Sequence, residues 1–432
     1  TRFESVAADE FPNQNEKKKK KKHHYGCEPE TIKEDEEIEM AVHQWNLPSI
    51  LNTNTNTIFF CSHLNYNKKK KESPPSPPLL LRRLPIPKLR VRATSAPADD
   101  AIAPPPPSSS SSGVQLGVGD IKDKYKRWLW KGQYSINYLV SVPPVSEGGA
   151  PPSPPPLLLV HGFGASIPHW RRNIGVLSET NTVYAIDLLG FGASDKPQGF
   201  SYTMESWAQL ILDFLEEVVQ RPTVLVGNSV GSLACVIAAS DFLQESRQNL
   251  VCGLVLLNCA GGMNNKAIVD DWRIKLVFPL LWLIDFLLKQ RVIASAIFNR
   301  VRQRDTLRGV LLSVYGNKEA VDDELVEIIR EPANDDGALD AFVSIVTGPP
   351  GPNPITLMPT ISMPVLILWG NQDPFTPLDG PVGKYFASLP TQLQNVSLQV
   401  LDGVGHCPHD DRPELVHQYL LPWLTQLASA EL

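Results

Sequence analysis

Short apolar runs recur along the chain from residue 157 onward, and helical patterns separate most of them. Each run has the length of a buried parallel strand, and the runs lie at 157–160, 183–186, 224–226, 254–257, 365–369 and 396–401. Between the second and third runs, apolar residues recur at the spacing of one helix face: Trp207, Leu210, Ile211, Phe214, Leu215 and Val218. Alternating strands and helices predict an α/β fold, with a mostly parallel sheet and helices on both of its faces.

A different pattern precedes these runs. Residues 128–141, WLWKGQYSINYLVS, predict two strands joined by a turn at Gly132, with Tyr134, Ile136 and Tyr138 on one face of the second strand. We expect this hairpin to add an antiparallel edge to the sheet.

One long segment interrupts the alternation. Residues 263–358 carry helical patterns but no convincing strand, so we expect a helical lid inserted between two parts of the core, 128–262 and 359–432. Within the lid, residues 272–288 are apolar nearly all round, apart from Pro279 and Asp285. A helix of this kind is either packed into a core or exposes its apolar surface for a purpose.

Three stretches come before the expected core. Residues 1–39 combine a lysine run with an acidic block and predict a disordered leader, which we expect to lie upstream of the natural start at Met40. Residues 40–93 are rich in Ser, Thr, Asn, Pro, Lys and Arg with almost no acid, which is typical of a plastid or mitochondrial transit peptide. The alternative is a disordered tail without a targeting role. Residues 94–127 contain a Pro and Ser tract and predict a disordered linker.

The composition of the chain argues against several classes of function. The net charge of -6 offers no basic surface for nucleic acid, so we expect no nucleic-acid partner. The six cysteines show no C-x-x-C spacing, which argues against a zinc site or a disulfide framework. No apolar run reaches the roughly 18 to 20 residues that a spanning helix needs. We therefore expect a soluble or peripheral protein.

The segment 223–240, TVLVGNSVGSLACVIAAS, contains the clearest chemical motif. An apolar strand pattern ends at Gly227, Ser229 follows between two glycines, and a helical pattern of small residues begins at once. A strand, sharp turn and helix of this kind form a nucleophile elbow, which lifts a serine hydroxyl above the sheet. G-x-S-x-G alone matches many unrelated turns, so the flanking elements and the partner residues elsewhere in the chain give this match its weight.

Acyl transfer by Ser229 needs a base, an acid that orients the base, and amides for the oxyanion. His406, in GVGHCPHDDRPE after the 396–401 run, is the candidate base, and Asp373, in GNQDPFTP after the 365–369 run, is the candidate acid. The main-chain amides of Phe163, in HGFG, and Val230 are the candidate oxyanion hole. This chemistry requires neither a metal nor a cofactor.

Two other residues compete for these roles. His409 is a rival base, although it lacks an adjoining glycine and the neighbouring Asp410 and Asp411 suggest a solvated loop. Asp402, close before His406, could replace Asp373 as the acid. His161 is interpreted as a residue that shapes the oxyanion loop.

Taken together, HGFG, DLLGFGASDKP, GNSVG, WGNQDP and GHCPHDDRPE resemble the α/β-hydrolase superfamily over residues 128–432 apart from the lid. Serine at 229, instead of aspartate, differs from haloalkane dehalogenases and epoxide hydrolases, and Ser232 stands where many members carry glycine. GNSVGS, GHCPHDD and the plastid-type leader are most similar to plant pheophytinases and chlorophyll dephytylases, which cleave the phytyl ester of chlorophyll pigments.

That resemblance implies release of phytol and chlorophyllide in the chloroplast, either in the stroma or at the thylakoid surface. A lipophilic ester of this size needs a large apolar cavity, for which the lid offers Trp272, Leu281, Trp282 and Phe286 as candidate contacts. The same residues could contact the thylakoid membrane peripherally. The alternatives are a carbon–carbon bond hydrolase, a general carboxylester hydrolase, or a small-molecule receptor that keeps a hydrolase pocket for binding.

Overall fold

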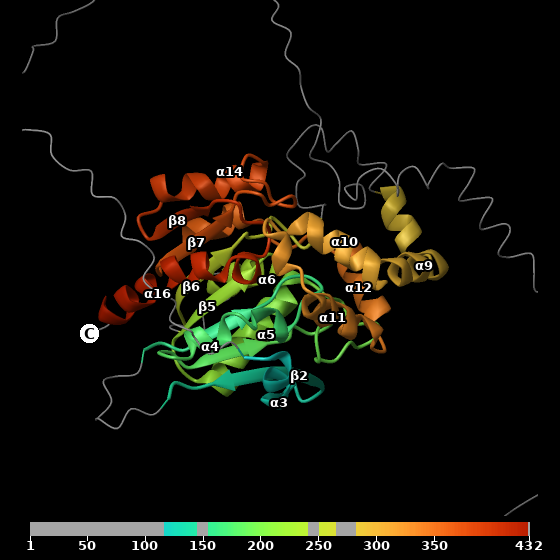
Figure 1. Ribbon diagram of the computed structural model, residues 1–432, viewed down its shortest axis with the longest axis horizontal. Helices are drawn as coiled ribbons and strands as arrows, with labels where there is room; N and C mark the ends of the chain where they lie inside the picture. Colours follow the sequence, from blue (N-terminus) through green and yellow to red (C-terminus); the bar gives the residue numbers. More distant parts are fainter. Residues whose placement is uncertain (1–115, 145–153, 241–249, 265–281, 431–432) are drawn as a thin grey trace, which may run out of the picture. The chain divides into compact units, whose positions relative to one another are not determined.

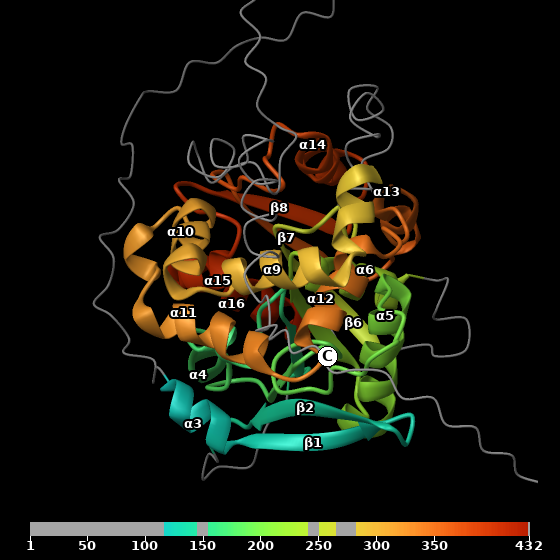
Figure 2. The same cartoon turned by 90° about the vertical axis from the view of Figure 1, so that its right-hand side faces the viewer.

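A computed structural model of the chain describes residues 116–144, 154–240, 250–264 and 282–430. These residues form an eight-stranded sheet in the order β1-β2-β4-β3-β5-β6-β7-β8 (Figures 1 and 2). The strands are β1 Tyr125–Trp130, β2 Tyr134–Ser141, β3 Leu157–Val160, β4 Val183–Ile186, β5 Thr223–Asn228, β6 Val251–Leu257, β7 Val365–Gly370 and β8 Val396–Leu401. The pairs β1–β2 and β2–β4 are antiparallel, and all other neighbours are parallel. The predicted fold class and the predicted antiparallel edge are confirmed.

The described residues also form helices, and some of these cover the two faces of the sheet. The longer ones are α5 Met204–Phe214, α6 Val230–Ala239, α9 Arg291–Val301, α10 Arg304–Val314, α11 Asp323–Arg330, α12 Ala338–Thr347, α14 Pro381–Ser388 and α16 Pro413–Ala430. The shorter ones are α3 Val118–Asp123, α4 Ile174–Leu177, α13 Pro354–Leu357 and α15 Pro408–Asp411, with short η turns at Ile167–Trp170 (η1), Leu215–Val219 (η2), Lys318–Ala320 (η4), Glu331–Asn334 (η5), Met358–Thr360 (η6) and Leu389–Thr391 (η7).

The alternation of side chains along the strands creates two separate cores. Leu158 and Val160 of β3 point into one core with α5, α6 and α14, whereas Leu157 and Leu159 point into the other with α3, α4 and α16. Successive residues of a strand face opposite sides of the sheet, so a strand that is apolar throughout must be covered on both sides. In Figure 2 the sheet runs between α5 on one side and α4 with α16 on the other.

The predicted crossover helix is present as α5 and continues into η2. Five of its six predicted apolar residues are buried and Val218 is half-buried. Thr203 caps the helix, because its hydroxyl accepts a hydrogen bond of 3.0 Å from the Ser206 amide while the Ser206 hydroxyl accepts one from the Thr203 amide.

Secondary structure is present further upstream than the sequence indicated. Part of the stretch assigned to a disordered linker, 94–127, forms α3 and the start of β1. Ile121 of α3 is fully buried in the second core. A six-residue helix with a single buried position has no apolar period, so the pattern could not reveal it. The proposed leader and transit peptide lie outside the described residues.

Between β6 and β7 the described residues form helices and loops but no strand. In Figure 1 the helices α9, α10, α11 and α12 gather beyond one end of the sheet. Helices α10 and α11 share a small core of their own, which also includes Tyr315 and Cys407. Within the described part of the chain, every helix is too short or too polar to cross a membrane.

Candidate active site

Ser229 occupies the sharp turn between β5 and α6. Its backbone has φ 55° and ψ -121°, a strained conformation for a residue with a side chain. The turn is held by tight packing: a Cβ atom on Gly231 would lie 2.5 Å from the Val160 carbonyl oxygen and closer still to that of His161. The elbow therefore needs glycine at 231, and it presents Ser229 at the carboxyl end of β5.

Asp373 and His406 meet at the carboxyl ends of β7 and β8. Asp373 Oδ2 lies 2.7 Å from His406 Nδ1, and both side chains are buried. Because an ionised carboxylate only accepts hydrogen bonds, His406 Nδ1 is the donor. A neutral imidazole in this tautomer keeps an unprotonated Nε2, which is the atom that a general base uses.

Further hydrogen bonds hold the Asp373 carboxylate. It accepts from the Thr376 hydroxyl at 2.6 Å, from the Asn258 side chain at 2.7 Å and from the main-chain amides of Phe375 and Thr376 at 2.7 and 3.1 Å. Burial alone would raise the pKa of Asp373, but His406 and the hydrogen bonds from Thr376 outweigh burial and lower it. Asp373 is therefore ionised at neutral pH.

Asn258 is a site residue that the sequence analysis missed. It follows β6 directly, has a left-handed φ of 42°, and is fully buried. Its side chain donates to Asp373 and accepts a hydrogen bond of 2.9 Å from the Gly370 amide. Its position in the sequence could have identified it, because a polar residue just after a buried parallel strand lies at the edge of the sheet where sites form.

The oxyanion candidates lie beside the elbow. Val230 is the first residue of α6, so its amide has no acceptor within the helix. Gly162, the neighbour of Phe163, packs on the elbow so closely that an added Cβ atom would lie 3.2 Å from Ser229 Cβ. The ring of Phe163 contacts Phe191 at 5.6 Å and Phe342 of α12 at 6.1 Å between centroids. The loop that carries the Phe163 amide thus touches both the elbow and the inserted helices.

His161 holds this loop in place. Its Nε2 accepts a hydrogen bond of 3.0 Å from the Leu188 amide, so its Nδ1 carries the proton and donates to the Gly162 carbonyl at 2.8 Å. Burial lowers the pKa of His161 and keeps the ring neutral. Both ring nitrogens are therefore engaged in main-chain contacts.

The two rival residues lie elsewhere. His409 is fully buried, with its Nε2 3.3 Å from His169 Nδ1 and its ring 4.1 Å from that of Trp170. Asp402 is exposed and accepts a hydrogen bond of 2.7 Å from Asn371. Neither takes part in the contact between Asp373 and His406.

The expectation of a solvated loop around His409 is wrong. Asp410 and Asp411 are 0% and 1% exposed. Their carboxylates bind groups that are distant in sequence, including Arg171 and the amide of Gly316. Neighbouring acidic residues usually indicate solvent, but buried carboxylates are stable where cations and amides surround them.

Ser232, which stands where many members of the superfamily carry glycine, fits between α6 and the sheet. The Ser232 hydroxyl donates to the Gly227 carbonyl at 2.7 Å and accepts from the Leu257 amide at 3.2 Å. It is fully buried, so these bonds satisfy a polar group between α6 and the sheet.

The candidate substrate contacts are only partly within the described residues. Trp272 and Leu281 lie outside them. Trp282 and Phe286, on the helix of residues 282–288, are 67% and 50% exposed and stack with centroids 5.9 Å apart. Their side chains therefore face solvent and do not belong to a packed core. In the described ranges, no group of three or more His, Cys, Asp and Glu side chains is placed to hold a metal ion.

Comparison with known proteins identifies a matching family and several similar proteins. A model of the Alpha/beta hydrolase family matches residues 157–418. The chain is 26% identical to uncharacterized hydrolase YugF of Bacillus subtilis over 268 residues, which cover 62% of this chain and 89% of that protein. It is 27% identical to the chloroplastic pheophytinase of Arabidopsis thaliana over 317 residues, which cover 64% of this chain and 62% of the pheophytinase.

Solved structures agree on the fold. A membrane phospholipase A, described as a bacterial virulence factor, is similar with a TM-score of 0.51 and 25% identity, covering 70% of this chain and 86% of the phospholipase. The epoxide hydrolase CorEH has a TM-score of 0.54 at 18% identity, covering 70% of this chain and 99% of CorEH, a likeness of fold alone.

Proposed function

The chain belongs to the alpha/beta hydrolase family, and we propose that it is a serine hydrolase that cleaves a carboxylic ester. In this proposal Ser229 is the nucleophile, His406 the base and Asp373 the acid that orients it. The observation that carries the proposal is the buried 2.7 Å hydrogen bond between Asp373 and His406, on loops at the same edge of the sheet as the strained Ser229 turn. Such an arrangement serves acyl transfer on many folds.

The steps follow from the atoms available. His406 Nε2 takes the proton of Ser229 Oγ as the oxygen attacks the ester carbonyl carbon, and the oxyanion receives hydrogen bonds from the Phe163 and Val230 amides. The ester C–O bond then breaks, and His406 returns the proton to the departing alcohol. Water repeats the sequence on the acyl-enzyme, which releases the acid and restores Ser229. Asp373 stabilises the imidazolium at each proton transfer.

We further propose a phytyl ester of chlorophyll or a related pigment as the substrate, with phytol and chlorophyllide as products. Support comes from the similarity to a chloroplastic pheophytinase and from the apolar lid segment that contains Trp272, Leu281, Trp282 and Phe286.

The transit-like composition of residues 40–93 supports a chloroplast location. A reporter fused to residues 40–100 should enter plastids, and a reporter that stays in the cytosol or enters mitochondria would contradict this location.

The exposed apolar residues of the lid favour contact with a membrane surface, where phytylated pigments dissolve. Leu283 and Ile284 of the same helix are also 45% and 43% exposed. The nearby Lys289 and Arg291 are also exposed. Exposed aromatic and aliphatic side chains beside basic ones suit the interface of an anionic bilayer.

The test compares three substrates with the purified protein: chlorophyll a, pheophytin a and p-nitrophenyl butyrate. We expect all three to be hydrolysed by the wild type and none by Ser229→Ala. Hydrolysis of the aryl ester with no release of phytol from either pigment would instead identify a general carboxylester hydrolase.

The lid is tested with the double variant Trp282→Ser/Phe286→Ser. We expect kcat/KM for pigment in anionic vesicles to fall about tenfold or more while that for the aryl ester stays within about twofold, because burial of each large apolar side chain is worth about 1.5 to 3 kcal/mol. Val400→Ser, which alters an exposed apolar residue of β8, is the matched control and should change neither rate. Equal losses on both substrates would contradict a lid role in pigment or membrane binding.

A further inference from the structure

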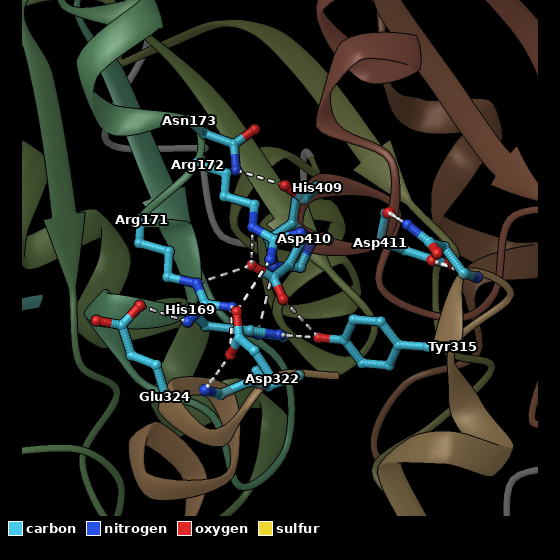
Figure 3. Close-up of polar contacts among 12 residues, drawn as sticks. His169, Arg171, Arg172, Asn173, Tyr315, Asp322, Glu324, His409, Asp410 and Asp411 are labelled. Atoms are coloured by element: carbon cyan, nitrogen blue, oxygen red, sulfur yellow. Dashed lines mark hydrogen bonds and ion pairs between the residues drawn. The ribbon is translucent and has the colours of Figure 1, made fainter. Parts of the chain in front are cut away.

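A buried polar cluster lies outside the proposed triad and joins three parts of the chain (Figure 3). One part is the end of η1 with the residues that follow it, one belongs to the inserted helical segment, and one is α15, which starts two residues after His406. The cluster comprises His169, Arg171, Arg172, Asn173, Tyr315, Asp322, Glu324, His409, Asp410 and Asp411. The proposed reaction uses none of these side chains.

Arg171 ties the inserted helices to the core. Its guanidinium is 1% exposed and bonds to Asp322 at 2.8 Å, Glu324 at 2.7 Å and Asp410 at 3.3 Å. Asp322 caps α11, and Glu324 lies in its first turn. The start of α11 is therefore fixed to the segment after η1 and to α15.

A chain of neutral groups runs beside Arg171. Tyr315 donates to Asp410 Oδ2 at 3.0 Å, so its oxygen accepts from His169 Nε2 at 2.7 Å. Burial lowers the pKa of His169 to about 3, so this ring is neutral and its Nδ1 accepts from His409 Nε2. These bonds join Tyr315, the residue after α10, to α15.

Asp411 connects the same two segments at the proposed base. Its carboxylate accepts hydrogen bonds from the amides of Gly405 at 2.6 Å, Gly316 at 2.8 Å and Asn317 at 2.7 Å. Gly405 directly precedes His406, whereas Gly316 and Asn317 belong to the inserted segment. The His406 amide in turn donates to the Val314 carbonyl, at the end of α10, at 3.0 Å. The Gly405 amide, through Asp411, and the His406 amide, directly, are thus bonded to residues 314–317.

Main-chain atoms, not side chains, form the contact between residue 316 and the His406 loop. A Cβ atom on Gly316 would lie 3.1 Å from the Gly405 amide nitrogen and 2.8 Å from the Gly403 carbonyl carbon. The two backbones therefore touch, and the 1% exposed Asp411 carboxylate bridges them. A carboxylate that binds several amides fixes their relative positions more firmly than a neutral acceptor does.

We propose that Asp411 is a positioning residue: it couples residues 314–317 of the inserted segment to the His406 loop, so that His406 is correctly placed only while this segment is docked. The proposal rests on the proposed function, because it assigns Asp411 a role in placing the base. Asp411 itself does not contact the substrate.

The experiment compares Asp411→Asn with Asp410→Asn. Both remove a buried charge from adjacent positions of α15, but Asp410 contacts Arg171 and Tyr315, whereas Asp411 contacts the His406 loop. Active sites are counted by titration with a fluorophosphonate, and kcat and KM for p-nitrophenyl butyrate are then measured per titrated site. Counting sites removes the effect of any unfolded fraction.

For Asp411→Asn we expect kcat per site to fall about tenfold to a hundredfold with KM within about threefold, because misplacing a catalytic group by a fraction of an ångström to one ångström has effects of this size. Asp410→Asn should lower the melting temperature but keep kcat per site within about threefold. An unchanged kcat per site in Asp411→Asn, or equal losses in both variants, would overturn the inference.

Gly316→Ala provides a second route if Asp411→Asn does not fold, because it crowds the same contact from the inserted segment and keeps the carboxylate. It should also lower kcat per site at constant KM, whereas Gly309→Ala, where an added Cβ atom meets nothing within 4 Å, should not. An unchanged kcat per site in Gly316→Ala would likewise overturn the inference. A wild-type protein that the fluorophosphonate fails to label would contradict the proposed function itself.

Discussion

The side chain of Asn228 donates a hydrogen bond of 3.0 Å to the main-chain carbonyl of His406. Asn228 directly precedes Ser229, so the turn of the proposed nucleophile and the loop of the proposed base are joined through one buried amide. The same amide lies 3.2 Å from the Leu257 carbonyl at the end of β6. Asn228 thus ties the end of β5 to the end of β6 and to the loop that follows β8.

Asn228→Ala should therefore reduce kcat by about tenfold and the free energy of unfolding by about 1 to 3 kcal/mol, because two buried carbonyls lose a donor. Ester assays and urea unfolding measure the two effects. Asn299→Ala is the control, since the exposed Asn299 bonds to Ser295 on the same helix, α9, and its loss should leave kcat unchanged. A kcat for Asn228→Ala equal to that of the wild type would show that this bond does not position His406.

Arg171→Met should lower the free energy of unfolding by about 3 to 5 kcal/mol, because it removes the closer guanidinium, at 3.3 Å, from the buried carboxylate of Asp410 and leaves Arg172, at 3.5 Å, as the remaining cation. Arg304→Met is the matched change at an exposed site, where the arginine pairs with Asp323 and Glu327, and it should cost no more than about 1 kcal/mol. Denaturant unfolding of both variants checks this prediction. Similar losses of stability in the two variants would mean that the buried cluster contributes little to the free energy of unfolding.

Gly231→Ala should prevent formation of the elbow, because its Cβ atom would overlap the carbonyl oxygens of Val160 and His161, which are main-chain atoms that cannot turn aside. We expect loss of esterase activity and a melting temperature lower by several degrees. Gly309→Ala lies inside α10 with open space around it and should stabilise the protein by up to about 1 kcal/mol. A Gly231→Ala enzyme of normal activity would contradict the close approach of α6 to β3.

The buried histidines make stability depend on pH. The pKa of His169 is lowered to about 3 by burial and by the nearby charges of Arg171 and Arg172, whereas an unfolded histidine titrates near 6.5. The unfolded chain therefore binds the extra proton between these values, so the stabilising effect is complete above pH 6.5 and is lost as the pH falls toward 3.

The free energy of unfolding should thus decline below pH 6.5, with His169 contributing up to about 1.4 kcal/mol per pH unit. His169→Gln, which keeps a donor and an acceptor but does not titrate, should show a shallower decline between pH 6 and 4. Urea unfolding at a series of pH values gives both slopes, and identical slopes would mean that His169 is not buried in its neutral form.

Local pattern was sufficient to predict the sheet, the elbow and the Asp373–His406 pair. Each depends on neighbours in sequence: short apolar runs form strands, glycines flank Ser229, and polar residues follow the last two strands where the chain must turn toward the site. Asn258 belongs to the same class of positions and could have been found by extending that reasoning to β6.

The cluster around Asp410 and Asp411 could not be predicted in this way. Its acidic residues resemble a solvated turn locally, and their partners Arg171 and Tyr315 lie 239 and 95 residues away. For the 282–288 helix, the sequence left open whether an apolar surface would be buried or exposed. Whether such a surface is buried depends on the elements that pack against it in the folded chain. In the structure Trp282 is exposed.

The most direct test of the account is mass spectrometry of the intact protein after treatment with a fluorophosphonate. The reagent forms a bond from phosphorus to an activated serine oxygen and loses fluoride, so the account predicts one adduct per chain, located on the peptide that contains Ser229. Ser229→Ala should give no adduct and less than about 1% of the wild-type ester hydrolysis, and His406→Ala should react at least about a hundredfold more slowly. Labelling of Ser229→Ala at the wild-type rate, or ester hydrolysis by that variant above this level, would contradict the assignment of Ser229 as the nucleophile.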